Sequence, residues 1–363
     1  MPNSEFTVVG KVKRNGPPNE LTEQLYTLSQ LRVIRAAPYQ NNGCTEMEGD
    51  EMAEDPIEIV NLRKEYGKFT AMNDLNLTIK KNSFTGLLGP NGAGKSTTLK
   101  ILTHLINATS GEAYLNGVDV TKDPKKALTD VGTVIETPEF YPYLTPRETF
   151  RYVGELIGMK KEQISAETED ILERVKMTDW GDKRLGTFSK GMRQRIALGQ
   201  ALLNDPSIII LDEPTSGLDP RGMAEIREVL KNLRNHSNNL TIVMSSHILP
   251  EVQDLCDRIA FINHGTLLKD DDISVFESSE GTRCLIAKID GLPTDDMIAQ
   301  IDSFDYVVSA ERLGNDIAIT MGADTKLRSR LYKDLSDMDM MIYGLTEQDA
   351  LEETYLDLIK ESR

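Results

Sequence analysis

Cysteine and histidine are scarce in this chain of 363 residues. The three cysteines, Cys44, Cys256 and Cys284, are odd in number and lie far apart, and there are only four histidines. This spacing fits neither a disulfide framework nor a zinc ligand set. We therefore expect a reduced, cytoplasmic protein, because disulfides persist mainly in oxidising compartments.

Long apolar runs are also missing. No segment approaches the roughly 20 consecutive apolar residues that a membrane-spanning helix needs. The first residues, MPNSEFTVVGKVKR, lack the apolar stretch of a signal peptide. Hydrophobic residues nevertheless make up 39% of the chain, which suffices for a sizeable core in one large domain with an appendage or in two ordinary domains.

Basic residues are too few to balance the acidic ones. The formal net charge is −17, and residues 270–363 alone hold 22 acidic and nine basic side chains, a net charge of −13. Such a surface repels phosphate backbones, so we expect no nucleic acid partner. A solvated acidic face that keeps the protein soluble accounts for this charge.

The chain divides into three parts by its pattern of residues. Residues 1–53 hold loop markers such as NGPPN and NNGC, and we expect a flexible extension. Residues 54–274 alternate strand-like runs with helical patterns, which predicts a mostly parallel sheet covered by helices. Within them residues 137–205 are mostly helical, and a capping box of Thr145 and Glu148 marks one helix start. Residues 275–363 predict a smaller α/β unit.

The segment GPNGAGKST fits the phosphate-binding pattern G-x-x-x-x-G-K-[ST] between a predicted strand and a predicted helix. Its members are Gly89, Pro90, Asn91, Gly92, Ala93, Gly94, Lys95, Ser96 and Thr97. Backbone N–H groups of such a loop and the following helix N-terminus face phosphate oxygens. We expect Lys95 to reach the β- and γ-phosphates and Ser96 to ligate Mg²⁺. The alternative is a glycine-rich turn with an incidental lysine.

Two adjacent carboxylates end the aliphatic run SIIIL. An ionised carboxylate at the end of a buried strand costs free energy unless a cation or a hydrogen-bond donor pairs with it. We expect Asp212 to hold a hydrated Mg²⁺ and Glu213 to orient or deprotonate the attacking water. The alternative is a pair of carboxylates that only cap the following helix.

With these motifs in place, the chain resembles the ATP-binding subunits of ABC transporters over about residues 57–274. FSKGMRQR looks like the signature motif of that family, and LCDRIAFINHG resembles the closing strand of its fold. Further residues match single motif positions in the order of the family: Tyr66 at the adenine-stacking aromatic, Glu136 at the glutamine loop, Asp219 in the D-loop sequence SGLD, and His247 at the switch histidine.

The resemblance implies an α/β P-loop NTPase fold, an ABC ATPase cassette at residues 54–274. It would have a RecA-like core, an antiparallel β subdomain and a helical subdomain, with a small α/β accessory domain at residues 275–363. The implied cofactors are ATP and Mg²⁺, with Glu136 beside Ser96 and Asp212 at the metal. His247 would bond the γ-phosphate.

The implied partners are other protein chains. Ser189 and Gly191 would bind the γ-phosphate of ATP held by a second copy or by a paralogous ATPase subunit. A separately encoded transmembrane permease would complete the transporter and place this chain on the cytoplasmic side of the membrane. A turn-edge tyrosine is the alternative for Tyr66, an ordinary helix N-cap for Ser189 and a structural histidine for His247.

Two departures from the commonest family pattern indicate a branch. Lys190 and Met192 replace glycine and glutamine in the signature motif, and Glu136 replaces glutamine. Both features are similar to exporters that include bacitracin-resistance and lantibiotic-immunity ATPases. We expect Glu136 to couple the ATP site to the membrane partner and not to act as the base.

Two questions stay open at the level of sequence. A soluble ABC ATPase that acts on ribosomes or DNA is the alternative function, although the chain has one P-loop and no long coiled coil. Phe140, Tyr141 and Tyr143 would form a socket for the permease or pack within the helical section. The cargo is open among antimicrobial peptides, lipids, ions and small drugs.

Overall fold

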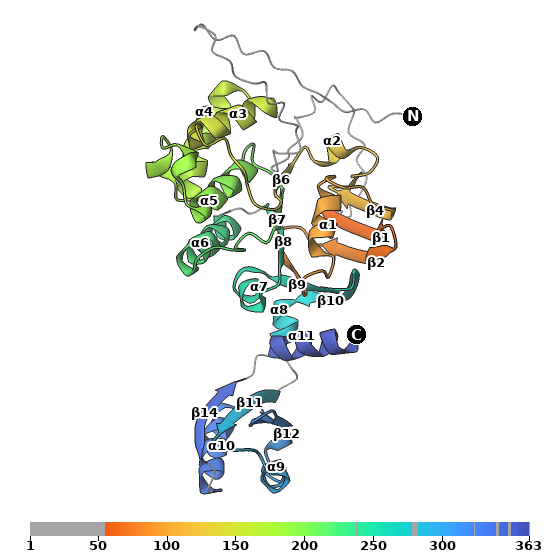
Figure 1. The fold of residues 1–363 in the computed structure, drawn as a ribbon, viewed down its shortest axis with the longest axis vertical. Helices are drawn as coiled ribbons and strands as arrows, with labels where there is room; N and C mark the ends of the chain where they lie inside the picture. Colours follow the sequence, from red (N-terminus) through yellow and green to blue (C-terminus); the bar gives the residue numbers. More distant parts are fainter. Residues whose placement is uncertain are drawn as a thin grey trace, which may run out of the picture.

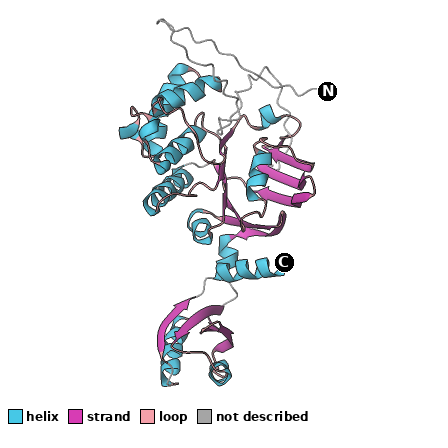
Figure 2. Cartoon of the chain, viewed as in Figure 1, coloured by secondary structure: helices cyan, strands magenta, loops and turns pink. Residues whose placement is uncertain are grey.

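The computed structural model describes residues 55–236, 239–277, 282–322, 324–338, 341–347 and 350–362. The expected N-terminal extension, residues 1–53, lies outside the described residues. Within the described ranges the chain forms three sheets, and helices pack against them (Figures 1 and 2).

A six-stranded sheet occupies the centre of the cassette, in the order β10-β9-β3-β8-β7-β6. Its strands are β3 (Phe84–Leu88), β6 (Val131–Val134), β7 (Ile208–Asp212), β8 (Thr241–Ser246), β9 (Arg258–Asn263) and β10 (Thr266–Asp272). All neighbours pair in parallel except β10 with β9. The five parallel strands are buried along their whole length, which explains their continuous aliphatic runs. The predicted parallel sheet is confirmed.

The parallel register sets the position of the functional residues. Asp212 at the end of β7 pairs with Ser245 of β8, and Leu88 at the end of β3 pairs with Ser246. The loops after β3, β7 and β8 therefore leave the sheet at one edge. Ligands of open α/β sheets bind outside this carboxyl edge.

A four-stranded antiparallel sheet covers one face of the central sheet (Figure 1). It contains β1 (Ile57–Tyr66), β2 (Phe69–Ile79), β4 (Ser110–Leu115) and β5 (Val118–Asp119). Helix α1 (Lys95–Leu102) lies between the two sheets, and the short helix α2 (Pro124–Ala127) lies beside β5. Leu99 and Leu102 of α1 are buried in the core between the two sheets.

Helices cover the opposite face of the central sheet. They are α3 (Pro146–Leu156), α4 (Lys161–Arg174), α5 (Lys190–Ala201), α6 (Pro220–His236) and α7 (Leu249–Leu255), with short 3-10 helices at Thr178–Trp180 and Leu185–Thr187. The capping box at α3 is confirmed, because the Thr145 hydroxyl accepts from the Glu148 amide and the Glu148 carboxylate accepts from the Thr145 amide. These helices share one large apolar core with the central sheet.

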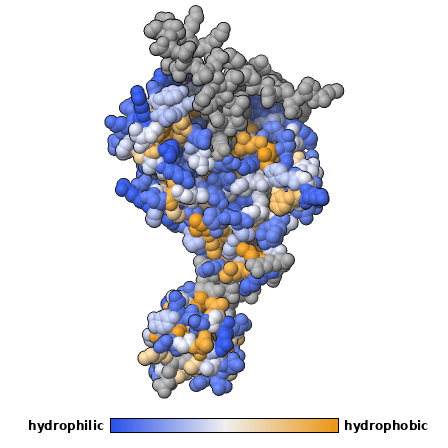
Figure 3. All heavy atoms as spheres, viewed as in Figure 1, coloured by the Kyte–Doolittle hydropathy of each residue, from blue (hydrophilic) through white to orange (hydrophobic). Residues whose placement is uncertain are grey.

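A smaller α/β unit follows α8 (Ile273–Glu277). It contains β11 (Thr282–Ile289), α9 (Asp295–Asp302), β12 (Val307–Leu313), β13 (Asp316–Gly322), α10 (Thr325–Asp337) and β14 (Ile342–Glu347). The order β12-β13-β11-β14 with antiparallel neighbours is the split βαβ arrangement, and it has its own apolar core. Figure 3 shows apolar side chains among hydrophilic ones on its surface.

The last helix, α11 (Ala350–Glu361), packs on the cassette. Leu351 is fully buried in the core that the central sheet shares with the covering helices, and the Tyr355 ring stacks on Phe261 of β9 at 5.8 Å between centroids. The Asn263 amide also donates to the Ser362 hydroxyl. The sequence placed all of residues 275–363 in one accessory unit, whereas the apolar face of α11 belongs to the cassette core.

None of the helices in the described ranges combines the length and the apolar character needed to cross a membrane.

The packing of α11 predicts a difference between two leucines of this helix. Leu351 is 0% exposed and Leu356 is 44% exposed. Leu351→Ala should lower the free energy of unfolding by about 2–5 kcal/mol, because it removes buried contacts and leaves a cavity. Leu356→Ala should change it by about 0.5 kcal/mol or less. Urea unfolding of the full chain measures both, and equal effects would contradict the observed packing.

Candidate functional site

Two glycines of the loop between β3 and α1, Gly89 and Gly94, lie close against neighbouring backbone. A Cβ at Gly89 would lie 2.0 Å from the Ile262 carbonyl oxygen. Gly94 has φ +108°, and a Cβ there would lie 3.0 Å from the Ala71 carbonyl oxygen. Gly94 also offers α1 no side-chain cap, so the first N–H groups of the helix are left for another acceptor.

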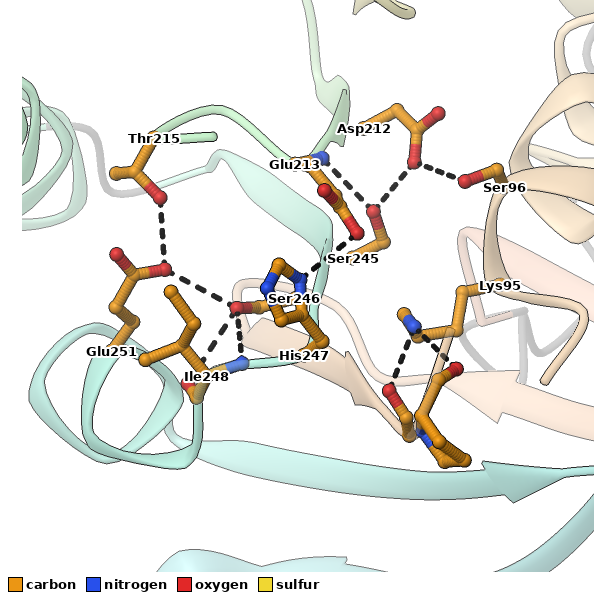
Figure 4. A network of polar contacts seen from close by, with 12 residues as sticks. Lys95, Ser96, Asp212, Glu213, Thr215, Ser245, Ser246, His247, Ile248 and Glu251 are labelled. Atoms are coloured by element: carbon orange, nitrogen blue, oxygen red, sulfur yellow. Dashed lines mark hydrogen bonds and ion pairs between the residues drawn. The ribbon is translucent and has the colours of Figure 1, made fainter. Parts of the chain in front are cut away.

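Lys95 is folded into this loop. It is buried, and its ammonium donates to the carbonyl oxygens of Gly89 at 2.7 Å and Pro90 at 3.0 Å (Figure 4). Burial lowers the pKa of the Lys95 ammonium, and the charges of Glu213 and Asp212 act in the opposite direction. The lysine thus brings a partly desolvated cation to the place where the sequence predicted phosphates.

Asp212 joins the loop to the central sheet. Its Oδ1 accepts hydrogen bonds from the Ser96 hydroxyl at 2.8 Å and from the Ser245 hydroxyl at 2.6 Å (Figure 4). The Ser245 hydroxyl accepts in turn from the Glu213 amide at 2.9 Å. The structure therefore brings Ser96 and Asp212 together, although 116 positions separate them in sequence.

Glu213 and His247 face each other across the same edge. The distance from His247 Nδ1 to Glu213 Oε1 is 3.1 Å, and both side chains are partly open to solvent. Glu213 has φ +44°, a left-handed conformation that costs free energy for a residue with a Cβ. Residues held in such conformations cluster at functional sites, and here the conformation turns the carboxylate toward His247.

Two cavities open at this edge. The larger, of about 360 Å³, is lined by Ser96, Glu136, Thr137, Lys190, Gln194, Asp212, Glu213 and Ser216. The smaller, of about 210 Å³, is lined by Tyr66, Phe69, Ala71, Asn91, Gly92, Ala93, Gly94, Lys95, Ser96, Thr97 and Glu213. Ser96 and Glu213 line both, so the loop residues, the acids and the predicted adenine-stacking tyrosine lie around two neighbouring cavities.

Tyr66 has an aromatic neighbour that the sequence analysis missed. Tyr66 pairs with Phe69 across the turn between β1 and β2, and both rings are exposed beside the smaller cavity. The Lys64 ammonium lies 4.9 Å from the centroid of the Tyr66 ring. The turn sequence YGKF held the signal for Phe69, because a tight turn places its two flanking residues opposite each other.

Glu136 lines the larger cavity together with Asp212. Its carboxylate is paired with the Lys100 ammonium of α1 at 2.6 Å, and its backbone has φ +62°. The acid is thus tied to the helix that follows the phosphate loop. The sequence analysis missed this role of Lys100.

Six predicted residues line neither cavity: Gly89 and Pro90, whose carbonyls accept from Lys95, His247, which faces Glu213, and Ser189, Gly191 and Asp219. The Ser189 hydroxyl caps α5 by accepting from the Met192 amide at 3.2 Å, and Gly191 is buried in the first turn of that helix. Asp219 Oδ1 accepts from the Gly222 amide at 3.1 Å at the start of α6. Lys190 connects the start of α5 to the larger cavity, since its ammonium donates to the carbonyl oxygen of Ser216 at 2.9 Å.

The described residues contain no group of three or more histidine, cysteine, aspartate or glutamate side chains arranged to hold a metal ion. The hydroxyl of Ser96 and the carboxylate of Asp212 are nevertheless oxygen donors of the kind that Mg²⁺ prefers. Because Mg²⁺ keeps several waters and takes further oxygens from phosphates, two protein ligands suffice.

Comparisons with known proteins agree with this geometry. A family profile described as "ABC transporter" matches residues 72–216. The chain is 39% identical over 214 residues to the bacitracin transport ATP-binding protein BcrA of Bacillus licheniformis, which covers 59% of this chain and 69% of the relative. It is 38% identical over 224 residues to the lantibiotic transport ATP-binding protein SrtF of Streptococcus pyogenes, which covers 62% of this chain and 94% of the relative.

A solved structure shares the architecture. It is a dimeric ATP-binding cassette in a post-hydrolysis state bound to ADP and Pi, with a TM-score of 0.53 and 26% identity, over 60% of this chain and 98% of that one. The fold, the arrangement at the carboxyl edge of the sheet and the relatives converge. The chain belongs to the ABC transporter family and is an ATP-binding, ATP-hydrolysing subunit of such a transporter.

Proposed function

We propose that this subunit hydrolyses MgATP between two closed cassettes and thereby drives export through a separately encoded permease. The observation that carries the proposal is the joint placement of Lys95, Ser96, Asp212, Glu213 and His247 at the carboxyl edge of the sheet. Each of these groups has a role that phosphate transfer to water requires.

The roles follow from the contacts. Lys95 and the loop amides bind the phosphates, and Ser96 with Asp212 would hold Mg²⁺, which would neutralise phosphate charge. Glu213 accepts the proton of the attacking water, and His247, 3.1 Å from Glu213, bonds the γ-phosphate. Glu136 lines the same cavity and supplies a further oxygen to the metal or its water.

The rest of the nucleotide has its own contacts. Tyr66 stacks on adenine, and Phe69 bounds the same pocket. Ser189, Gly191 and Asp219 lie outside the two cavities, at the starts of α5 and α6, and serve the nucleotide of a second copy or of a paralogous subunit. The amides at the start of α5 and its dipole favour an anion there. A dimeric relative with ADP and Pi supports this arrangement.

A substitution at Glu213 tests the catalytic assignment. Glu213→Gln should lower ATP turnover by about 100-fold or more, because the amide cannot accept the proton of water. With excess MgATP, the variant should stay closed as a dimer, which light scattering measures. Glu162→Gln, the same substitution at an exposed position of α4, is the matched control.

Two outcomes would contradict the assignment. Wild-type turnover of Glu213→Gln would show that another group is the base. If the variant binds MgATP tightly but stays monomeric, even in the presence of its permease, the proposed closed dimer is wrong.

An aromatic surface on the helical side is proposed as the permease contact. The Tyr141 ring lies 5.6 Å from that of Tyr143 and 6.2 Å from that of Tyr152, between centroids. Tyr143, Tyr152 and Leu156 are exposed, whereas Phe140 packs against the large core. The sequence left open whether these aromatic residues contact the permease or pack within the helical section. Phe140 packs within the protein, whereas Tyr143 is available to a partner. Exposed aromatic anchors are typical of interfaces.

This surface yields a second test. Tyr143→Ala should reduce copurification with the permease in detergent, because it removes an anchor that is 61% exposed. Tyr332→Ala, which removes a tyrosine that is 53% exposed on the C-terminal unit, should retain copurification. Equal recovery of the permease with both variants would place the contact elsewhere.

Peptide antibiotics are the proposed cargo class. The relatives named for bacitracin transport and lantibiotic transport support this class, since both names refer to antimicrobial peptides. The permease would hold the cargo contacts, and the cassette would sit at the cytoplasmic face of the membrane.

A further inference from the structure

Glu251 is a buried acid with no part in the chemistry described so far. It lies on α7, is 2% exposed, and has no ion pair in the part of the chain that the structure describes. Its Oε2 accepts from the Thr215 hydroxyl at 2.8 Å and from the Ser246 hydroxyl at 3.2 Å. Its other oxygen, Oε1, is buried without a hydrogen-bond partner among the described residues. A buried carboxylate left half satisfied is costly and calls for an explanation.

The two hydroxyls that donate hydrogen bonds to Glu251 belong to the two chain segments that carry the proposed reacting groups. Thr215 follows Glu213 by two residues, and Ser246 directly precedes His247. Figure 4 shows Glu251 between these loops, on the side away from Asp212. One carboxylate oxygen therefore connects the chain segment of Glu213 to that of His247.

The connection extends into the backbone. The Ser246 hydroxyl also accepts a hydrogen bond from the Ile248 amide at 3.0 Å. The Ser246 side chain therefore spans the turn, because Ser246 precedes His247 and Ile248 follows it. On the other side, Glu213 is held at its amide by Ser245. The loop that carries the left-handed Glu213 backbone is thus held at two points, at the Glu213 amide by Ser245 of β8 and at Thr215 by Glu251.

We propose that Glu251 is a positioning residue that fixes the separation of Glu213 and His247. It acts as a hydrogen-bond acceptor at the junction of the two loops, and its negative charge is not required. The inference rests on the proposed roles of Glu213 and His247, and it deepens them. Loss of the acceptor lets the two loops move apart, which slows the chemical step while the phosphate loop keeps its contacts with nucleotide.

The central experiment compares Glu251→Ala with Glu251→Gln by steady-state ATPase kinetics on the full chain. Glu251→Ala should lower kcat by about tenfold to 100-fold, because small displacements of reacting groups cost this much, and leave KM within about threefold. Glu251→Gln should keep kcat within about threefold, since its amide oxygen can accept from both hydroxyls. Asp254→Asn, on the same helix and exposed, is the control for charge loss.

A second variant guards against misfolding of Glu251→Ala. Thr215→Val keeps the shape of the side chain but removes the donated hydrogen bond. It should lower kcat with unchanged KM. Combined with Glu251→Ala it should lower kcat no further than the stronger single change, since both remove the same connection.

The outcomes separate this inference from the proposed function. Wild-type kcat in Glu251→Ala or in Thr215→Val would overturn the positioning role. So would an equal loss in Glu251→Gln and Glu251→Ala, which would show that charge matters, or fully multiplicative effects in the double variant. Glu213→Gln, measured in parallel, tests the proposed base: if it turns over normally the proposed function fails, whereas if it is inactive and Glu251→Ala is normal only this inference fails.

Discussion

The site depends on one carboxylate oxygen. Asp212 Oδ1 accepts from Ser96, at the start of the helix after the phosphate loop, and from Ser245, on the neighbouring strand. These bonds join the start of α1 to the ends of β7 and β8 at the edge that we propose binds nucleotide. Ser245 passes the constraint to the Glu213 amide, so the position of the proposed base follows from that of the proposed metal ligand. Oriented groups of this kind act without reorganisation during the reaction.

The same edge carries several features that cost free energy. Lys95 is buried, Glu213 and Glu136 have left-handed backbones, and Glu251 is an acid with one unpartnered oxygen. The fully buried strands of the central sheet and the apolar cores on both of its faces supply the packing that offsets these costs. Stability and function are therefore separated in space, with packing beneath the edge and strain at it.

Features that depend on neighbouring residues in the sequence were predicted best. The strand and helix that flank the glycine-rich loop, the aliphatic strands and the capping box at Thr145 each depend on a short run of residues, and the structure confirms them. Sequence reasoning missed Glu251 and Phe69, because their surroundings depend on which loops the fold brings together. It also placed α11 with the accessory unit, since a helical pattern shows that a face is apolar but not which core it joins. Roles of residues toward a second subunit lie beyond one chain for the same reason.

The most direct test of the central claim measures the metal. Mn²⁺, titrated into the chain with ATP and followed by electron paramagnetic resonance, reports the affinity of the site for a divalent cation. For Asp212→Asn the account predicts Mn²⁺ binding weaker by roughly tenfold or more, with metal-free ATP affinity retained, because the carboxylate serves the metal and Lys95 serves the phosphates. Equal Mn²⁺ affinity in the wild type and the variant would contradict it.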